Sequence, residues 1–220
     1  MRKSRSISSR IAIGIGAVAL TLLAQQSDQP RPTCHHCRAT YIPVSELDAY
    51  TAKALRYGIV DQQVRSVDVG KLQVGIGMVT RGKLVAGTTR TGAVAEHEQV
   101  SEVYHIIEGT ATLLTGPDLV NAKKRPDSEK TVRLQNGPGW NADSIASPLV
   151  HHLKPSDVIV IPAGTGHWFT EIPDHITYLM VRIDPDKVVP TKDQKQSEDD
   201  LKAFPPRSYN CVKTARSLTG

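Results

Sequence analysis

The sequence lacks any apolar run long enough to cross a membrane. Its longest uncharged apolar stretch is Ile11 to Ala24, which is shorter than the roughly 18–20 residues that a spanning helix needs. A protein with several membrane-spanning helices is therefore excluded. Aromatic residues are also scarce, at 5% of the 220 residues, whereas Gly and Pro number 16 and 14. That balance favours a turn-rich β protein over a helix bundle.

Net charge is nearly absent once the N-terminus is set aside. The chain has 27 Lys and Arg against 22 Asp and Glu, a formal charge of +5. Four of the cations precede the apolar stretch with no acidic residue among them: Arg2, Lys3, Arg5 and Arg10. Basic residues followed by a short apolar run are typical of a secretory signal peptide, which here would be residues 1–24. The rest of the chain has 27 − 4 = 23 basic and 22 acidic residues, a charge of +1.

This distribution predicts an exported protein, periplasmic or extracellular, that is not stably inserted in a membrane once the signal is cleaved. A basic excess that resides in a targeting segment gives no support for nucleic acid or a membrane surface as a partner. The alternative is that the segment stays uncleaved and anchors the protein.

Cysteine is also rare, at three residues: Cys34, Cys37 and Cys211. Export implies an oxidising compartment, in which cysteines usually pair, so we expect one structural disulfide. Whether Cys211 joins Cys34 or Cys37 stays open. Metal or redox use of the C-x-x-C pair is the alternative. A c-type haem site is excluded because Arg38 stands where that motif needs His.

The remaining chain divides into an arm with a helix, a β region and a polar tail. Residues 25–62 contain a proline-bearing arm and then a helix over Ser45–Tyr57, which Ser45 caps and Gly58 ends. Its predicted apolar face consists of Leu47, Tyr50, Ala54 and Leu55. The β region spans 63–186, and the tail 187–220 is predicted to be flexible.

Short β segments separated by turn residues fill the β region, at spacings typical of a barrel or sandwich. The predicted strands lie at 64–69, 72–79, 103–114 (split by a glycine), 150–153, 157–161 and 176–183. The polar stretch 116–140 is predicted to be a surface loop, with the basic run Lys123 to Arg125 in solvent.

Two segments place His and Glu beside apolar strands. The first runs from Glu96 to Gly109 and the second from Ser156 to Phe169. Strand alternation puts Glu102 on the same face as Tyr104 and Ile106, and His105 on the opposite face. A carboxylate facing an apolar interior needs a partner or a metal. Two His and one carboxylate converging in a β core compose a facial triad with open positions.

Both segments resemble the motifs of the cupin superfamily. In the first, Glu102 and Gly109 match the family's Glu, six residues, Gly. In the second, Pro162, Gly164 and His167 match Pro-x-Gly-x-x-His. The resemblance covers roughly 63–185 and implies an all-β fold, a double-stranded β-helix (jelly-roll or cupin barrel), here with a short N-terminal helix.

The resemblance further implies three metal ligands, His97, Glu102 and His167. The family's additional histidine is missing, because Ala95 occupies its position. Candidates for a fourth ligand are Glu96, Glu98, His151 and His152, or water. Each ligand also has a plain structural interpretation: His97 as a loop histidine, for instance, or Glu102 paired with an arginine across the barrel. Tyr104 and Phe169 are predicted to line a pocket, with core packing as the alternative.

These residues suit a divalent transition metal, Fe, Mn, Ni, Zn or Cu. The leading hypothesis is therefore an exported single-domain cupin that acts on or binds a small organic molecule, as an oxygenase, isomerase or lyase. The alternative is a non-catalytic cupin that binds a small ligand with a degraded metal site. Catalytic residues and substrate stay unassigned, and a homodimer stays open.

Overall fold

The computed structural model describes residues 33–34, 37–88 and 90–204. It divides the chain into two units, Met1–His35 and His36–Gly220, and all elements below belong to the second. The predicted signal segment and Cys211 lie outside the described residues. Cys34 and Cys37 are both disulfide-bonded. Within the described residues, no helix combines the length and hydropathy that a membrane span requires.

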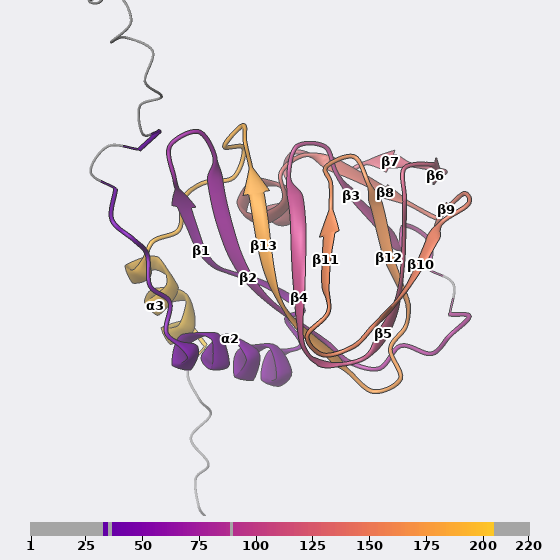
Figure 1. Ribbon diagram of the computed structural model, residues 1–220, viewed down its shortest axis with the longest axis horizontal. Coiled ribbons are helices and arrows are strands. Elements are labelled where there is room, and N and C mark those ends of the chain that lie inside the picture. Colours follow the sequence, from indigo (N-terminus) through magenta and orange to yellow (C-terminus); the bar gives the residue numbers. More distant parts are fainter. Residues whose placement is uncertain (1–32, 35–36, 89, 205–220) are drawn as a thin grey trace, which may run out of the picture. The chain divides into compact units, whose positions relative to one another are not determined.

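Two antiparallel sheets face each other (Figure 1). The first has the order β1-β2-β13-β4-β11, and the second β10-β5-β12-β3-β8-β7. The strands of the first sheet are β1 (Asp61–Asp68), β2 (Gln73–Arg81), β13 (Ile176–Asp184), β4 (Ser101–Gly109) and β11 (Val158–Ile161). Those of the second are β10 (Leu149–Leu153), β5 (Ala111–Gly116), β12 (Gly166–Glu171), β3 (Val94–His97), β8 (Gly139–Ala142) and β7 (Lys123–Lys124). A further pair joins β6 (Leu119–Val120) to β9 (Ser144–Ile145).

The chain passes back and forth between the sheets, so that β13 lies between β2 and β4 while β12 lies between β5 and β3. This order is that of a double-stranded β-helix, which confirms the predicted fold class. The alternation of β4 is also as predicted, with Glu102, Tyr104 and Ile106 no more than 2% exposed and His105 exposed. Apolar side chains from both sheets form the core between them: Val79, Tyr104, Ile106, Ala111, Leu113, Leu153, Ile161, Phe169, Ile172, Ile176, Tyr178 and Met180.

Helix α2 (Val44–Tyr57) packs on β1 and β2, where Tyr50 forms a small cluster with Val64 and Met78. The prediction of its start is wrong by one residue, because Pro43 takes the N-cap position and no side chain caps the helix. Leu55 is also misassigned to the buried face, since it is 71% exposed. Gly58 ends the helix in the left-handed conformation, as predicted.

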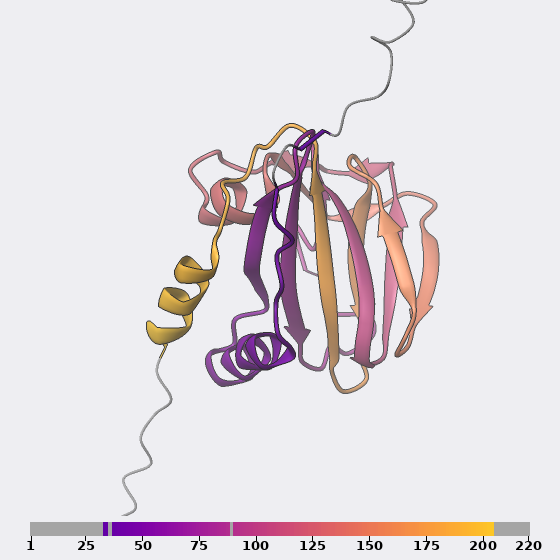
Figure 2. The same ribbon diagram turned by 60° about the vertical axis from the view of Figure 1, so that its left-hand side comes forward.

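The segment 187–204 is docked, so the prediction of a flexible tail is wrong for these residues. The backbone of Lys192 bridges to β1, and helix α3 (Gln194–Lys202) begins with a capping box. Asp200 on α3 forms ion pairs with Lys53 of α2 at 2.8 Å and with Lys192 at 2.9 Å. Figure 2 shows the two helices on the same side of the first sheet. The ion pairs of Asp200 therefore hold the segment 187–204 against the rest of the protein.

The stretch 116–140 is not a simple loop. It contributes β6 and β7 and then one turn of π-helix, η2 (Val132–Asn136). Lys123 and Lys124 are exposed, as predicted, but Arg125 is only 7% exposed. Its assignment to solvent is wrong because β7 pairs with β8 and carries the next residue into the barrel.

Gly109, the last residue of the first motif, allows a first prediction. Its φ is +77°, and an added Cβ would lie 2.0 Å from the carbonyl oxygen of His175. Gly164 has a similar φ of +79° with nothing within 4 Å of such a Cβ. Both substitutions to Ala incur the roughly 1–2 kcal/mol cost of the left-handed conformation, but only Gly109→Ala also forces backbone apart. We expect urea unfolding to show a clearly larger stability loss for Gly109→Ala. Equal losses in the two variants would contradict the close approach.

Candidate metal centre

Three strands bring the predicted ligands together. His97 ends β3, Glu102 is the second residue of β4, and His167 is the second residue of β12. His167 lies opposite Ala95 in the β3–β12 pair, so both histidines project from neighbouring positions. All three are at most 8% exposed, and one ligand atom from each lies within 4.8 Å of the others. Ala95 therefore stands on β3 at the position where the cupin motif has its additional histidine.

Glu102 lies between the two histidines. Its Oε1 is 3.5 Å from His97 Nε2, and its Oε2 is 3.6 Å from His167 Nε2. Tyr104 donates a hydrogen bond of 2.7 Å to Oε2, and Arg182 Nε donates one of 3.3 Å to Oε1. Burial alone would raise the pKa of Glu102, but the surrounding histidines, Arg182 and Tyr104 lower it to about 2. The carboxylate is therefore ionised at neutral pH.

Arg182 links this carboxylate to strand β1 of the same sheet. It pairs with Glu102 in the β13–β4 register and is 2% exposed. Its Nη1 donates to Gln63 Oε1 at 2.6 Å, and its Nη2 donates to Asp61 Oδ2 at 2.5 Å. Gly77 of β2 leaves space for the guanidinium, since a Cβ there would lie 3.2 Å from Nη1. Glu102 is therefore paired with an arginine, as the alternative interpretation expected, but that arginine lies on the neighbouring strand of the same sheet and not across the barrel.

The ring of His167 is oriented for metal binding. Its Nδ1 is 3.3 Å from the carbonyl oxygen of Thr165. A carbonyl can only accept, so Nδ1 carries the hydrogen and Nε2 keeps its lone pair. Metal-bound histidines usually donate their second ring N–H in this way. Burial lowers the pKa of His167, so the ring is neutral at pH 7 with Nε2 directed at Glu102.

His97 has the opposite arrangement. Arg125 Nη2 donates to His97 Nδ1 at 3.0 Å and to the carbonyl oxygen of Glu96 at 2.5 Å. A guanidinium cannot accept, so Nδ1 of a neutral His97 holds the lone pair and Nε2 carries the hydrogen. That hydrogen points at Glu102. A metal on Nε2 would require the ring to turn over or to lose this proton.

The donor set fits a divalent metal. Two atoms bound at about 2.0–2.2 Å to one ion can be no more than about 4.4 Å apart, and both carboxylate–histidine distances satisfy this limit. In addition, the lone pair of His167 Nε2 and Glu102 Oε2 face each other as two acceptors. A cation between them would remove that repulsion. Two features described above work against the ion: the contact of Arg125 with His97 Nδ1 and the ion pair of Arg182 with Glu102.

The candidates for a fourth ligand do not join this cluster. Glu98 accepts from Trp140 Nε1 at 2.8 Å, and His151 contacts Thr115 Oγ1 at 2.8 Å. His152 is exposed. Glu96 points to the other face of β3, where it accepts from the backbone of Trp140 at 3.1 Å. Among the described residues, only His97, Glu102 and His167 form a group that could hold a metal.

A cavity of about 350 Å³ opens beside His167. Phe169 lines it, as predicted, whereas Tyr104 is not part of its wall and instead packs edge-on against His167 within the cluster. Ala95 is among the lining residues. The missing family histidine therefore leaves space next to His167.

No protein-family model matches the sequence, and no curated protein matches it. Solved structures do. A protein from Bacillus halodurans is 11% identical, with 75% of this chain and 97% of that chain covered and a TM-score of 0.38. A cupin protein from Bacteroides fragilis is 14% identical over 52% and 68% of the two chains, with a TM-score of 0.29. An RmlC-like cupin with a double-stranded β-helix fold, from Methanocaldococcus jannaschii, is 15% identical over 58% and 85%, with a TM-score of 0.31.

The chain resembles cupins. With TM-scores below 0.5, the fold assignment rests on the strand order of this chain itself. The two cupin motifs lie where that fold brings β3, β4 and β12 together.

Two arginines of the cupin-like site were missed by sequence reasoning. Arg125 lies in a run of exposed cations, and nothing local distinguishes it from Lys123 and Lys124. Arg182 did carry a usable signal. It stands between Val181 and Ile183 in an apolar strand, in phase with the buried Tyr178 and Met180, so alternation alone places a cation in the core.

The buried neutral histidines predict a pH dependence for the metal-free protein. Burial lowers the pKa of His97 to about 3 and lowers that of His167 as well. The unfolded chain protonates both near pH 6.5, whereas the folded chain does not. Stability is therefore fully present above about pH 6.5 and is lost progressively as the pH falls toward about 3. We expect the urea midpoint to fall over this window.

The control for this titration is His151→Gln, which leaves both buried histidines in place and should follow the unaltered protein. His97→Gln removes one of them and should show a shallower decline. A midpoint that is constant from about pH 7 to about pH 4 contradicts the burial of two neutral imidazoles.

Proposed function

We propose that this chain is an exported cupin-like protein in which His97, Glu102 and His167 hold one divalent transition metal next to a cavity for a small organic molecule. The observation that carries the proposal is the pair of facing acceptors, His167 Nε2 and Glu102 Oε2, 3.6 Å apart in a buried cluster. Such a pair is unfavourable unless a cation lies between the two atoms. Two imidazoles and one carboxylate suit Fe, Mn, Ni, Zn or Cu.

The chain's own residues would prepare the site in three ways. Tyr104 and Arg182 fix the orientation of Glu102 and keep it ionised. The Thr165 carbonyl fixes the tautomer of His167. The barrel wall excludes bulk water, because each ligand is nearly fully buried. A bound metal would supply Lewis-acid or dioxygen-binding chemistry, and the proposed activity is of the oxygenase, isomerase or lyase type.

Equilibrium binding of metal to the purified chain tests this proposal. The protein is stripped with a chelator, dialysed, and titrated separately with Mn, Fe(II), Ni, Cu and Zn. We expect about one equivalent of at least one metal to bind. Less than about a tenth of an equivalent of every metal, in protein that is folded by circular dichroism, contradicts a metal centre.

A second candidate function, binding of a small ligand without catalysis, is favoured by the two arginines. Arg182 already neutralises Glu102, and Arg125 directs a cation at His97. Under this hypothesis the cluster is a buried polar network that supports the barrel. The metal titration separates the two candidates.

The contact between Arg125 and His97 predicts that a substitution beside the proposed metal centre strengthens metal binding. In Arg125→Gln, the amide oxygen can accept from His97 Nδ1–H, which frees Nε2 for the metal, and a nearby cation is removed. Outer partners of ligating histidines typically change affinity by about 10–100-fold. We therefore expect metal to bind about 10-fold more tightly to Arg125→Gln, measured by competition with a chromogenic chelator.

The matched control is Lys124→Gln, which removes the neighbouring exposed cation and should leave the affinity unchanged. Weaker binding by Arg125→Gln would show instead that Arg125 supports the ligand geometry.

Export is part of the same proposal and rests on the first 24 residues alone. We expect intact-mass analysis of the protein secreted by its native host to show a chain that begins at about Gln25. A mass that includes the basic N-terminus would favour the uncleaved anchor.

A further inference from the structure

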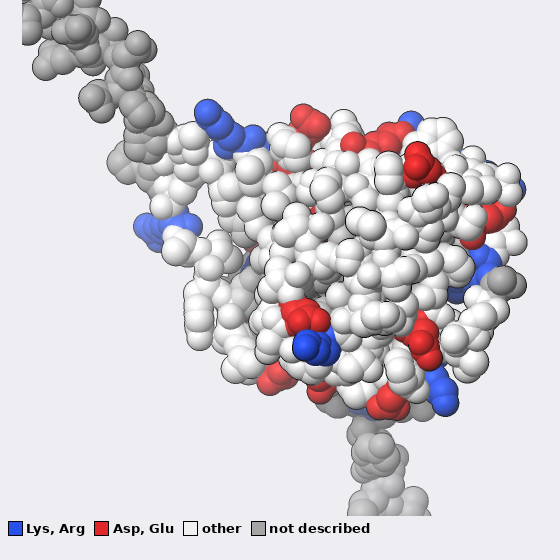
Figure 3. Space-filling model, turned by 45° about the vertical axis from the view of Figure 1, so that its right-hand side comes forward, with Lys and Arg blue, Asp and Glu red and all other residues white. Residues whose placement is uncertain are grey.

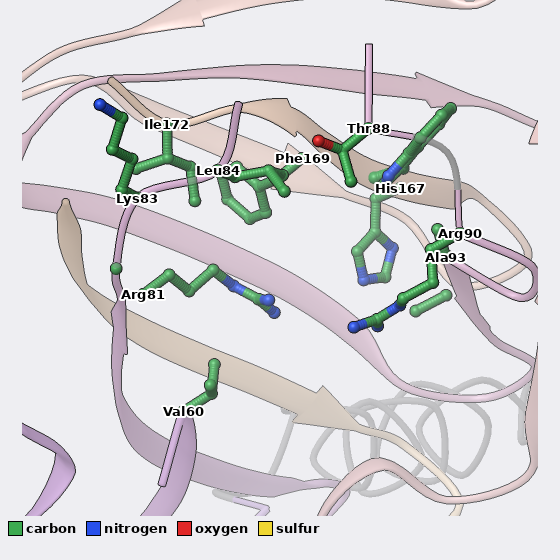
Figure 4. Close-up of a pocket in the computed structure, with 13 residues that line it drawn as sticks. Val60, Arg81, Lys83, Leu84, Thr88, Arg90, Ala93, His167, Phe169 and Ile172 are labelled. Atoms are coloured by element: carbon green, nitrogen blue, oxygen red, sulfur yellow. The ribbon is translucent and has the colours of Figure 1, made fainter. Parts of the chain in front are cut away.

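The cavity beside His167 is lined by three cations and no acidic residue. Figure 4 shows its lining side chains, with the guanidinium groups of Arg81 and Arg90 directed toward the space in front of the His167 ring. Lys83 is the third cation. The full lining is Val60, Arg81, Gly82, Lys83, Leu84, Thr88, Arg90, Ala93, Ala95, His167, Trp168, Phe169 and Ile172.

Arg81 is held in place but its charge is not paired. Its Nε donates to Tyr178 Oη at 3.4 Å, and the guanidinium lies 5.0 Å from the centre of the Phe169 ring. Among the described residues, no carboxylate lies within 4.0 Å of it, and neither terminal amino group has a hydrogen-bond partner. By contrast, the buried Arg182 and Arg65 each form ion pairs. Arg81 therefore presents two free donors on a fixed guanidinium.

Two further cations, Arg90 and Lys83, line the same cavity as Arg81. Arg90 and Lys83 are exposed and form no ion pair with a described carboxylate. Figure 3 shows that elsewhere, on one face of the molecule, acidic and basic side chains are scattered among broad uncharged areas. A concave site with one sign of charge raises the local concentration of ligands with the opposite sign.

Apart from Thr88 and His167, the remaining side chains of the wall are mainly apolar. Leu84, Phe169 and Ile172 lie on one side of the cavity, and Ala95 leaves room next to His167. A volume of about 350 Å³ is at the small end of the range for ligand sites. The lining thus combines a cationic group with an apolar surface over a short distance.

We infer that this cavity binds a small organic carboxylate, with the carboxylate on Arg81 and Arg90 and the apolar body against Leu84, Phe169 and Ile172. A planar guanidinium with two free donors matches a carboxylate bidentately. The bound molecule would lie against His167, at the edge of the proposed metal centre. The inference rests on the proposed function, because it names the substrate class of that site.

Calorimetric titration of the chelator-treated protein tests this, because carboxylate cannot then bind through a metal. The probes are benzoate and its neutral counterpart benzamide, with phenyl phosphate as a third ligand. We expect benzoate to bind at least about 10-fold more tightly than benzamide, and Arg81→Met to remove most of that preference. Arg90→Met is the second variant, since Arg90 is exposed and its loss does not threaten folding.

The matched control is Arg133→Met, which removes an exposed arginine outside the cavity. It should leave the affinities for benzoate and benzamide unchanged. Equal affinity for benzoate and benzamide, or a preference that survives both Arg81→Met and Arg90→Met, would overturn the inference. Tighter binding of phenyl phosphate than of benzoate would overturn the carboxylate assignment. A protein that binds benzoate through Arg81 but binds no metal contradicts the proposed metal centre alone. One that binds metal but no benzoate contradicts this inference alone.

Discussion

His167→Ala is expected to bind divalent metal about 100-fold more weakly than the unaltered protein. His167 is the ligand whose tautomer is already set for metal binding, with Nδ1–H on the Thr165 carbonyl and Nε2 facing Glu102. Removing it leaves one carboxylate that is neutralised by Arg182 and one histidine whose Nδ1 accepts from Arg125. These two remaining groups are too few, and too occupied by the arginines, to hold a transition metal tightly.

The measurement is competition with a chromogenic chelator at fixed pH, with the bound metal counted by mass spectrometry. His151→Ala is the matched control, because His151 is a histidine of the same sheet that lies outside the cluster. It should keep its affinity for the metal. If His167→Ala retains full metal content, the ligand assignment is wrong.

Glu102→Ala is expected to destabilise the metal-free protein by about 3–5 kcal/mol, the usual cost of removing one partner of a buried ion pair. Arg182 would keep Asp61 and Gln63 but lose the carboxylate at Nε, and the Tyr104 hydroxyl would lose its acceptor. Burial prevents water from replacing either contact readily. Urea unfolding monitored by circular dichroism gives the free energy directly.

Glu108→Ala is the control for this experiment, because Glu108 is a carboxylate of the same strand that is exposed. A change within about 0.5 kcal/mol is expected there. The double variant Glu102→Leu, Arg182→Leu removes both charges of this pair but leaves Asp61 without its cation, so it should recover only part of the loss. A Glu102→Ala protein as stable as the Glu108→Ala protein would contradict the buried network.

The fold could be predicted because its signals are local. Alternation along β4 places Glu102, Tyr104 and Ile106 inward whatever the partner strands are. The spacing from Glu102 to Gly109 also fixes where that strand must turn, since Gly109 adopts a positive φ. The start of α2 was less predictable, because a proline at the N-cap position displaced a serine with better capping chemistry.

For the candidate site, the sequence predicts the three proposed ligands but not the residues that surround them. His97, Glu102 and His167 each belong to a motif whose spacing reports a strand end or a tight turn. The environment of these ligands depends on pairings between distant segments, such as β7 with β8, which brings Arg125 to His97. Arg81 and Arg90 meet at the cavity for the same reason. No periodicity in the sequence encodes such juxtapositions.

Anomalous diffraction from a crystal soaked with the metal that binds most tightly would locate the ion in the proposed centre. We expect one anomalous peak, enclosed by the side chains of His97, Glu102 and His167, that disappears in His167→Ala crystals. A metal-saturated crystal with no peak there, and with Glu102 still bonded to Arg182 and Tyr104 alone, would contradict it.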